Sequence, residues 1–456
     1  NELDTIPEEV VAEVQLNANG LDFSKYVSVG ASFTAGFTDN ALFKASQENS
    51  FPNILATKFK AVGGGDFNQP LMNDNIGGLL LGGNVIQGPR LYFNGAAPAS
   101  LPAIPTTDVL VNVGGNLNNF GVPGAKSFHL LAPGYGNPAG VSLGLANPYF
   151  ARMATNASAT VIGDAMAQAP TFFTLSEIGG NDVLGYATSG GSGVDQSLPT
   201  PGNPAGNLDP STYKSNDITN PLVFKQVFTG MVTTLTAGGA KGVVANVPYI
   251  TSLAHFTTVP YNPIPMSVGL VAQVNAAYAP YNGGLQQLLD AKNAGLLPAH
   301  VMQLLANFDQ AEVDKRKISF SAGQNAVVIM DENLTDLTLI NPALVNMRQA
   351  TSSDLLVLTS SSFIGTLADP NNPASVNGVG VPLGDKWVLT PEEQLSIKTA
   401  TDAYNTIIEG VVASNDNITM VDFKGVLVEA STGIAFDGYT MTTSLVTGGL
   451  VSLDGV

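Results

Sequence analysis

The sequence predicts a three-layer α/β fold, in which helices cover both faces of a central parallel sheet (α/β/α) and loop and helical insertions enlarge the domain. Short runs rich in β-branched and aromatic residues alternate with amphipathic segments along most of the chain, which is the pattern of βαβ units. Hydrophobic residues make up 44% of the 456 residues, so the chain can bury a large core.

The expected elements follow from local patterns of apolar residues and from the turn residues that bound them. Strands are expected over residues 26–29, 90–93, 171–175, 242–247, 326–330, 355–358 and 418–423. Helices are expected over residues 51–62, 157–168, 222–235, 266–278, 285–297, 299–308 and 391–412.

The helix over 391–412 has the clearest start signal. Thr390 is a good N-cap, Pro391 suits the first helical position, and Glu393 completes a capping box. The acidic pair Glu392–Glu393 is therefore interpreted as a helix start favoured by the macrodipole, and not as an acid/base pair.

Residues 23–456 are expected to form one domain, preceded by an N-terminal tether or tail over 1–22 that looks like a processed or trimmed start. The span is about twice what a compact α/β domain needs. The surplus in 62–120, 183–217 and around 255–350 is expected to build a lid or side lobe over the edge of the sheet where the functional site lies.

Composition excludes several classes of function. Acidic residues outnumber basic residues by 36 to 18, and a net charge of −18 disfavours binding to nucleic acid or to anionic lipid headgroups. The absence of cysteine excludes disulfides and thiolate chemistry. No apolar run is long enough for a membrane-spanning helix.

The segment around Ser32 carries the first chemical signal. A strand-like run ends at Gly30, Ser32 follows two residues later, and Gly36 comes four residues after that. α/β hydrolases present a nucleophilic serine on such a turn after a strand. The alternative is that Ser32 only caps the helix that follows.

Three later segments complete a pattern. Residues 119–125 contain glycines that allow backbone N–H groups to approach a substrate oxygen, and 171–182 is a strand that leads into Gly-x-Asn-Asp at Asn181–Asp182. An asparagine amide at a strand end can donate to a developing oxyanion. The last segment, 448–456, contains Asp454. Ordinary turns are the alternatives for Asn181–Asp182 and for Asp454.

These four blocks, in this order, resemble the SGNH (GDSL-type) hydrolase family, and most of all its large secreted or lipoprotein members from Bacteroidetes-type bacteria. The resemblance implies that Ser32 is the nucleophile. It implies an oxyanion hole made by the backbone N–H groups of Ser32 and Gly124 and by the Asn181 side chain. Asp454 would orient the catalytic histidine, and Asp182 would hold the Asn181 loop.

Two departures from the family pattern bear on activity. The usual Gly-Asp-Ser is Gly-Ala-Ser here, so Ala31 cannot make the loop hydrogen bonds of an aspartate. The family places its histidine three residues after the aspartate, one position beyond Val456, and we expect the natural chain to carry it there. His129, His255 and His300 are weaker candidates for the base.

The resemblance implies hydrolysis of an acyl ester, such as a lipid, a short acyl ester or an acetylated glycan, without metal or cofactor. It also implies an extracytoplasmic location, as an outer-membrane lipoprotein or secreted protein of a Gram-negative bacterium. The alternative is a non-catalytic binding or accessory subunit on the same fold, for example a glycan-binding component of an outer-membrane uptake complex.

Overall fold

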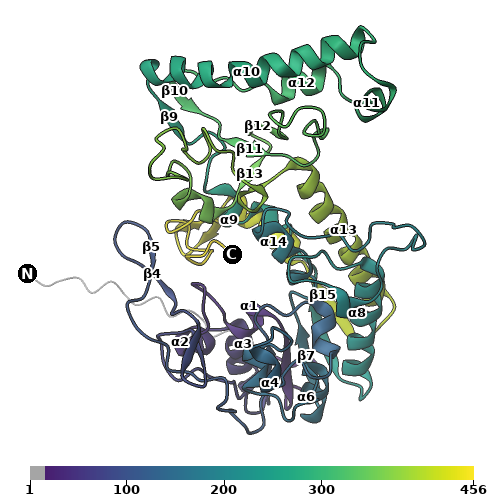
Figure 1. Cartoon of the computed structure of the whole chain (residues 1–456). Helices are drawn as coiled ribbons and strands as arrows, with labels where there is room; N and C mark the ends of the chain where they lie inside the picture. Colours follow the sequence, from purple (N-terminus) through teal and green to yellow (C-terminus); the bar gives the residue numbers. More distant parts are fainter. Residues whose placement is uncertain (1–15) are drawn as a thin grey trace, which may run out of the picture.

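The centre of the molecule is a five-stranded sheet in which all neighbouring strands are parallel (Figure 1). The computed structural model describes residues 16–456, so most of the tether expected over 1–22 lies outside the described residues. The strands are β1 (Tyr26–Gly30), β6 (Asn119–Gly121), β7 (Phe172–Leu175), β8 (Lys241–Ala245) and β15 (Ile418–Val421), in the spatial order β15-β8-β7-β1-β6. Numbered by their place in the chain, these strands run 2-1-3-4-5 across the sheet.

Alternate side chains of the sheet enter cores on opposite faces. Val27 and Phe173 pack into the main core with helices α6 (Val161–Ala167), α8 (Pro221–Thr236) and α13 (Pro391–Ala413). Their neighbours Tyr26 and Phe172 face the other way and pack on α3 (Phe51–Lys60). The expected α/β architecture, a parallel sheet flanked by helices, is confirmed at this level.

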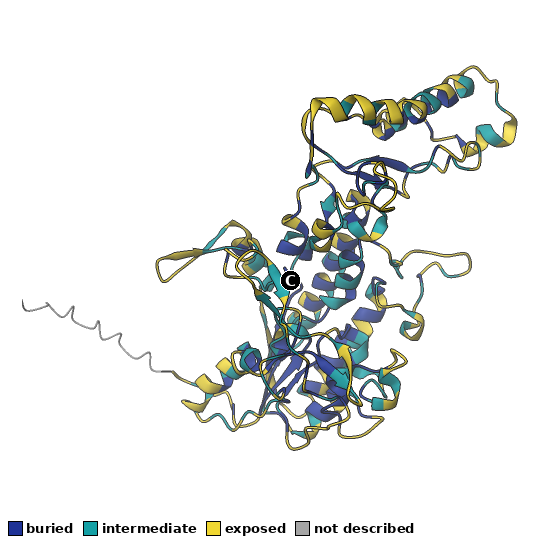
Figure 2. Cartoon of the chain, turned by 60° about the vertical axis from the view of Figure 1, so that its left-hand side comes forward, coloured by how far each residue is buried: buried dark blue, intermediate teal, exposed yellow. Residues whose placement is uncertain are grey.

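A second hydrophobic core lies outside the sheet, within residues 259–388. It carries most of the segment expected as an insertion around 255–350. Figures 1 and 2 show this lobe on one side of the sheet domain, with the outer side of α10 exposed. Its elements are β9 (Ile264–Met266), α10 (Val268–Asn293), α11 (Ala299–Leu304), α12 (Gln310–Arg316), β10 (Gly323–Asn325), β11 (Val328–Met330), β12 (Met347–Gln349), β13 (Leu355–Leu356) and β14 (Val388–Leu389). The short helix α9 (Ala254–Thr257) comes just before the lobe in sequence, and its Phe256 packs in the main core.

The remaining elements are short and lie on loops or at the sheet edge. They are α1 (Ser32–Ala35), α2 (Lys44–Glu48), β2 (Leu79–Leu81), β3 (Asn84–Gln87), β4 (Leu91–Phe93), β5 (Pro98–Ser100), α4 (Pro138–Val141), α5 (Pro148–Ala151), α7 (Asn181–Thr188), α14 (Phe423–Thr432), β16 (Ile434–Phe436) and β17 (Tyr439–Met441). Single 3₁₀ turns are η1 (Ser127–Leu131), η2 (Pro210–Thr212), η3 (Ile250–Ser252), η4 (Leu358–Ser362) and η5 (Asp385–Trp387). No helix of the described chain combines the length and the apolar character needed to span a bilayer.

Two expectations about elements were wrong. The helices expected over 266–278 and 285–297 form one helix, α10, with Pro280 inside it. One face of α10 buries Tyr278, Tyr281 and Leu285 in the second core. This packing on both sides of Pro280 keeps the chain helical through the proline. Residues 119–121, where no strand was expected, form the edge strand β6, which pairs with β1.

Candidate functional site

The expected site residues gather at the carboxyl edge of the sheet. Ser32 follows β1, Gly124 follows β6 and Asn181 follows β7, and these three strands are neighbours. The strand order reverses between β1 and β7, because the chain passes from β1 to β6 on one side and then to β7 on the other. Open α/β sheets bind their ligands outside the carboxyl ends of the strands at such a switch point.

Ser32 is the first residue of helix α1, and Ala31 occupies the N-cap position without a side-chain hydrogen bond. The alternative that Ser32 caps the helix is therefore wrong. The cap comes from Glu177, which follows β7 and accepts hydrogen bonds from the N–H groups of Ala31 (2.6 Å), Phe33 (2.8 Å) and Thr34 (3.1 Å). The Glu177 carboxylate does not take the N–H of Ser32, which lies between these donors.

Glu177 has an uncommon backbone conformation and a carboxyl whose pKa is raised. Its backbone has a φ of +53°, a left-handed conformation that is uncommon for a residue other than glycine. Burial raises the pKa of its carboxyl to about 7, against the opposing effect of the three N–H donors. Its residue type gave no signal in the sequence, since the acid and the turn it caps are 144 positions apart.

Two glycines let α1 sit directly on the strand ends. A Cβ on Gly30 would lie 2.0 Å from Oγ1 of Thr34, and a Cβ on Gly121 would lie 2.2 Å from the backbone N of Ala35. Neither position has room for a side chain. The helix that carries Ser32 is therefore fixed on both β1 and β6 by close backbone contact.

The hydroxyl of Ser32 is available for chemistry. The residue is half-buried, and its side chain makes no hydrogen bond to any other residue within 16–456. Gly124 is exposed, has a φ of +78°, and has no atom within 4 Å of where its Cβ would be. Its backbone N–H therefore lies in a loop that a ligand could approach closely.

Asn181 is linked to the Gly124 loop. Its amide nitrogen donates to the backbone carbonyl of Ala125 at 2.9 Å, which leaves the second N–H of the amide for another acceptor. The next residue, Asp182, is fully buried and accepts from both the N–H (2.9 Å) and the hydroxyl (2.7 Å) of Ser127. Burial raises the pKa of Asp182, and the hydrogen bonds oppose that rise.

The segment around Asp454 lies against the loop that follows Ser32. The Asp454 carboxylate accepts from the N–H of Asn40 at 2.8 Å, and Asp39 accepts from the N–H of Leu453 at 3.0 Å. The Asp454 carboxylate also bonds its neighbours Ser452 and Val456. Asp454 is thus brought to the serine side of the sheet, although its carboxylate is engaged by local donors.

His255 is the histidine that the structure places beside Asp454. The ring Nδ1 of His255 lies 3.3 Å from the backbone carbonyl of Asp454. The backbone N–H of His255 donates to the backbone carbonyl of Gly455 at 2.9 Å. Its Nε2 is buried without a partner in the described chain. Burial lowers the pKa of His255, which favours the neutral form of its ring.

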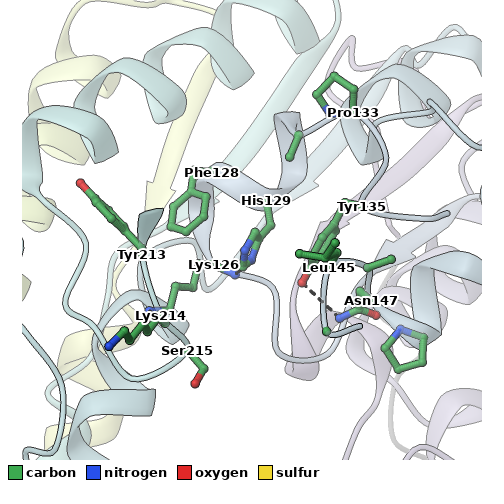
Figure 3. Close-up of a pocket in the computed structure, with 14 residues that line it drawn as sticks. Lys126, Phe128, His129, Pro133, Tyr135, Leu145, Asn147, Tyr213, Lys214 and Ser215 are labelled. Atoms are coloured by element: carbon green, nitrogen blue, oxygen red, sulfur yellow. Dashed lines mark hydrogen bonds between the residues drawn. The ribbon is translucent and has the colours of Figure 1, made fainter. Parts of the chain in front are cut away.

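His129 lines a separate pocket of about 310 Å³, together with Lys126, Tyr135 and Tyr213 (Figure 3). Its ring stacks on Tyr135 at 4.4 Å, and its Nδ1 accepts the N–H of Lys126 at 3.1 Å. Burial lowers its pKa to about 4. Ser32 and Asn181 do not line this pocket. His300 lies on α11 in the second lobe and is exposed.

Comparison with protein-family models, with curated protein sequences and with solved structures found no match to this chain.

Proposed function

We propose that this chain is a serine ester hydrolase of the SGNH type, with Ser32 as its nucleophile. The observation that carries the proposal is the place of Ser32. It begins a helix at the switch point of a parallel sheet with the order 2-1-3-4-5, and its hydroxyl makes no side-chain hydrogen bond within residues 16–456. Gly124 and Asn181 come from the two strands that flank β1, which supports a shared role at one edge.

In this proposal the Ser32 hydroxyl attacks an acyl carbonyl and a base accepts its proton. The oxyanion accepts hydrogen bonds from the N–H groups of Ser32 and Gly124 and from the free N–H of the Asn181 amide. The leaving alcohol then departs with a proton, and water hydrolyses the acyl-enzyme.

The family pattern takes its base from a histidine three residues after the aspartate. The Asp454 segment lies on the loop that follows Ser32, through Asp39 and Asn40, which favours delivery of a base to that side of the sheet. The proposed substrate is a lipid ester, a short acyl ester or an acetylated glycan. The proposed location of the protein is extracytoplasmic.

A non-catalytic binding protein on the same fold is the second candidate. Two observations favour this second candidate. Ala31 stands where the family pattern has an aspartate, and no base within residues 16–456 is hydrogen-bonded to the Ser32 hydroxyl. A binding function would survive loss of the Ser32 hydroxyl, whereas hydrolysis would not.

The test is hydrolysis of p-nitrophenyl acetate and butyrate by the full natural chain and by Ser32→Ala. We expect saturable turnover in the wild type and a loss of about 10³-fold or more in kcat in the variant. Ser24→Ala is the matched control, because Ser24 is exposed in the turn just before β1, at the opposite end of that strand. Equal rates in wild type and Ser32→Ala would overturn the proposal.

A further inference from the structure

Three carboxylates meet at the junction between the sheet domain and the second lobe. Glu332 follows β11 of the second lobe, Asp385 begins η5, and Glu393 lies in the first turn of α13. Each offers one carboxylate oxygen, and these oxygens all lie within 4.8 Å of one another. We call these three residues the carboxylate cluster.

Glu393 is the buried member of the cluster. Only 3% of its surface is exposed, and its Oε2 accepts from the N–H (2.6 Å) and the hydroxyl (2.8 Å) of Thr390. Its Oε1 is buried without any hydrogen-bond partner in the described chain. Gly191 makes room for this oxygen, because a Cβ at that position would lie 1.8 Å from it. The fold therefore holds a buried carboxyl oxygen in place and supplies no donor for it, and burial raises the pKa of this carboxyl to about 8.

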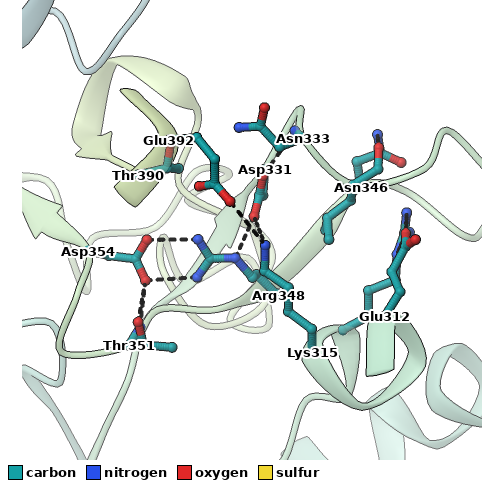
Figure 4. Close-up of polar contacts among 12 residues, drawn as sticks. Glu312, Lys315, Asp331, Asn333, Asn346, Arg348, Thr351, Asp354, Thr390 and Glu392 are labelled. Carbon is teal, nitrogen blue, oxygen red and sulfur yellow. Dashed lines mark hydrogen bonds and ion pairs between the residues drawn. The ribbon is translucent and has the colours of Figure 1, made fainter. Parts of the chain in front are cut away.

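The acids beside the cluster, unlike its members, form ion pairs with basic side chains. Figure 4 shows Arg348 between two buried aspartates, with its Nε 2.5 Å from Asp331 and its terminal nitrogens 2.7 Å from Asp354. Lys315 lies 3.2 Å from Asp331 and 3.8 Å from Glu392. Within residues 16–456, no lysine, arginine or histidine forms an ion pair with a member of the carboxylate cluster.

We propose that the carboxylate cluster binds a hard divalent cation, with Ca²⁺ the best fit. All three donors are carboxylate oxygens, which Ca²⁺ and Mg²⁺ prefer, and Ca²⁺ accepts irregular oxygen geometry. Glu332 is exposed and Asp385 is half-buried, so water can complete the coordination from that side. The unpaired Oε1 of Glu393 would become an inner ligand.

A cation at this place links both hydrophobic cores. Glu332 belongs to a loop of the second core, while Ile397 and Tyr404 on the helix that starts beside Glu393 belong to the main core. Bound Ca²⁺ would therefore fix the lobe on the sheet domain. This inference is independent of ester hydrolysis.

The test is calorimetric titration of the chelator-treated, dialysed full chain with CaCl₂, paired with thermal unfolding in chelator and in CaCl₂. We expect one saturable site per chain, with a Kd below about 1 mM, and an unfolding midpoint that Ca²⁺ raises by a few degrees. Glu332→Gln removes an exposed ligand without disturbing a core, and Glu393→Gln keeps an acceptor for Thr390. Each should weaken Ca²⁺ binding by about tenfold or more.

Glu392→Gln is the matched control, since Glu392 is adjacent in sequence but pairs with Lys315 outside the cluster. It should bind Ca²⁺ as the wild type does. Wild-type protein that shows no saturable binding up to about 10 mM CaCl₂, or binding that survives both cluster substitutions, would overturn the proposal.

Discussion

The position of the Ser32 hydroxyl depends on a carboxylate from another strand. Glu177 binds three N–H groups at the start of α1 and so supplies the cap that Ala31 lacks. Helix α1 has only four residues, so it cannot hold its own geometry. The Ser32 turn therefore depends on other parts of the chain: Glu177, which follows β7, and close backbone contact with β1 and β6.

Glu177 should give the protein a pH-dependent stability. Its pKa of about 7 in the folded state exceeds the value of about 4.3 for an unfolded glutamate, so the folded state holds the proton more tightly. The Glu177 contribution to the free energy of unfolding is thus fully present below about pH 4.3. It is lost as pH rises to 7, by at most about 1.4 kcal/mol per pH unit.

Urea unfolding of wild type and Glu177→Gln between pH 4.5 and 7.5 checks this slope. Other buried acids titrate in both proteins, so the difference between the two curves isolates Glu177. We expect the stability advantage of the wild type to shrink as pH rises. Parallel curves would show that Glu177 titrates normally.

Asn181→Ala should impair catalysis more than stability. The substitution removes the free N–H proposed for the oxyanion, so kcat should fall by about 10²–10³-fold with a small change in KM. The lost bond to Ala125 costs about 1 kcal/mol of stability. Steady-state kinetics on a p-nitrophenyl ester measures the split, with Asn53→Ala on α3 as control. A change confined to KM would contradict the oxyanion role.

At the scale of elements, the contact between α1 and β6 is the most sensitive. Gly121→Ala places a Cβ 2.2 Å from a backbone nitrogen of α1, and backbone cannot move aside cheaply. We expect a loss of at least about 1–3 kcal/mol in the free energy of unfolding, together with reduced activity. Gly238→Ala, where nothing lies within 4 Å, should be close to neutral. Equal stabilities of the two variants would refute this packing argument.

Elements with strong local signals were predictable from the sequence. The helix α13 begins where Thr390 and Pro391 predict, and Glu393 accepts the Thr390 N–H as a capping box requires. β6 was missed because its three residues, Asn119–Gly121, are too few to show a periodic pattern. Only their pairing with β1 makes them a strand. Two helices were expected over 266–278 and 285–297, but burial on both sides of Pro280 keeps the chain helical throughout α10.

At the scale of the whole molecule, the two hydrophobic cores imply two units that can open separately. Arg348 is the polar centre of the second core, paired with Asp331 and Asp354, whose side chains are fully buried. Arg348→Met should leave these carboxylates short of a partner and destabilise the lobe by about 3–5 kcal/mol. Hydrogen exchange should show lost protection in β11 and β12, while β1 and β7 stay protected.

Lys398→Met is the control for this prediction. It removes an exposed pair with Asp402, and such pairs contribute about 0–1 kcal/mol. If Arg348→Met changed exchange no more than Lys398→Met does, the ion-pair network would not be holding the second core.

The family resemblance related distant segments to one site, but the individual contacts between those segments could not be predicted from the sequence. The motif around Ser32 predicted a serine at a strand end, but not that Asp454 would dock on Asn40, 414 positions away. Glu393 was predicted to cap a helix, which it does, but it also belongs to a cluster of carboxylates that only tertiary packing assembles. Long-range contacts of this kind leave no local pattern.

The central claim is that Ser32 is an activated nucleophile. Intact-mass and peptide mass spectrometry of the natural full chain after treatment with a fluorophosphonate probe tests it most directly. We predict a single adduct, on Ser32, that is absent from Ser32→Ala and unchanged in Ser24→Ala. No adduct, or an adduct on another residue that Ser32→Ala retains, would contradict the account.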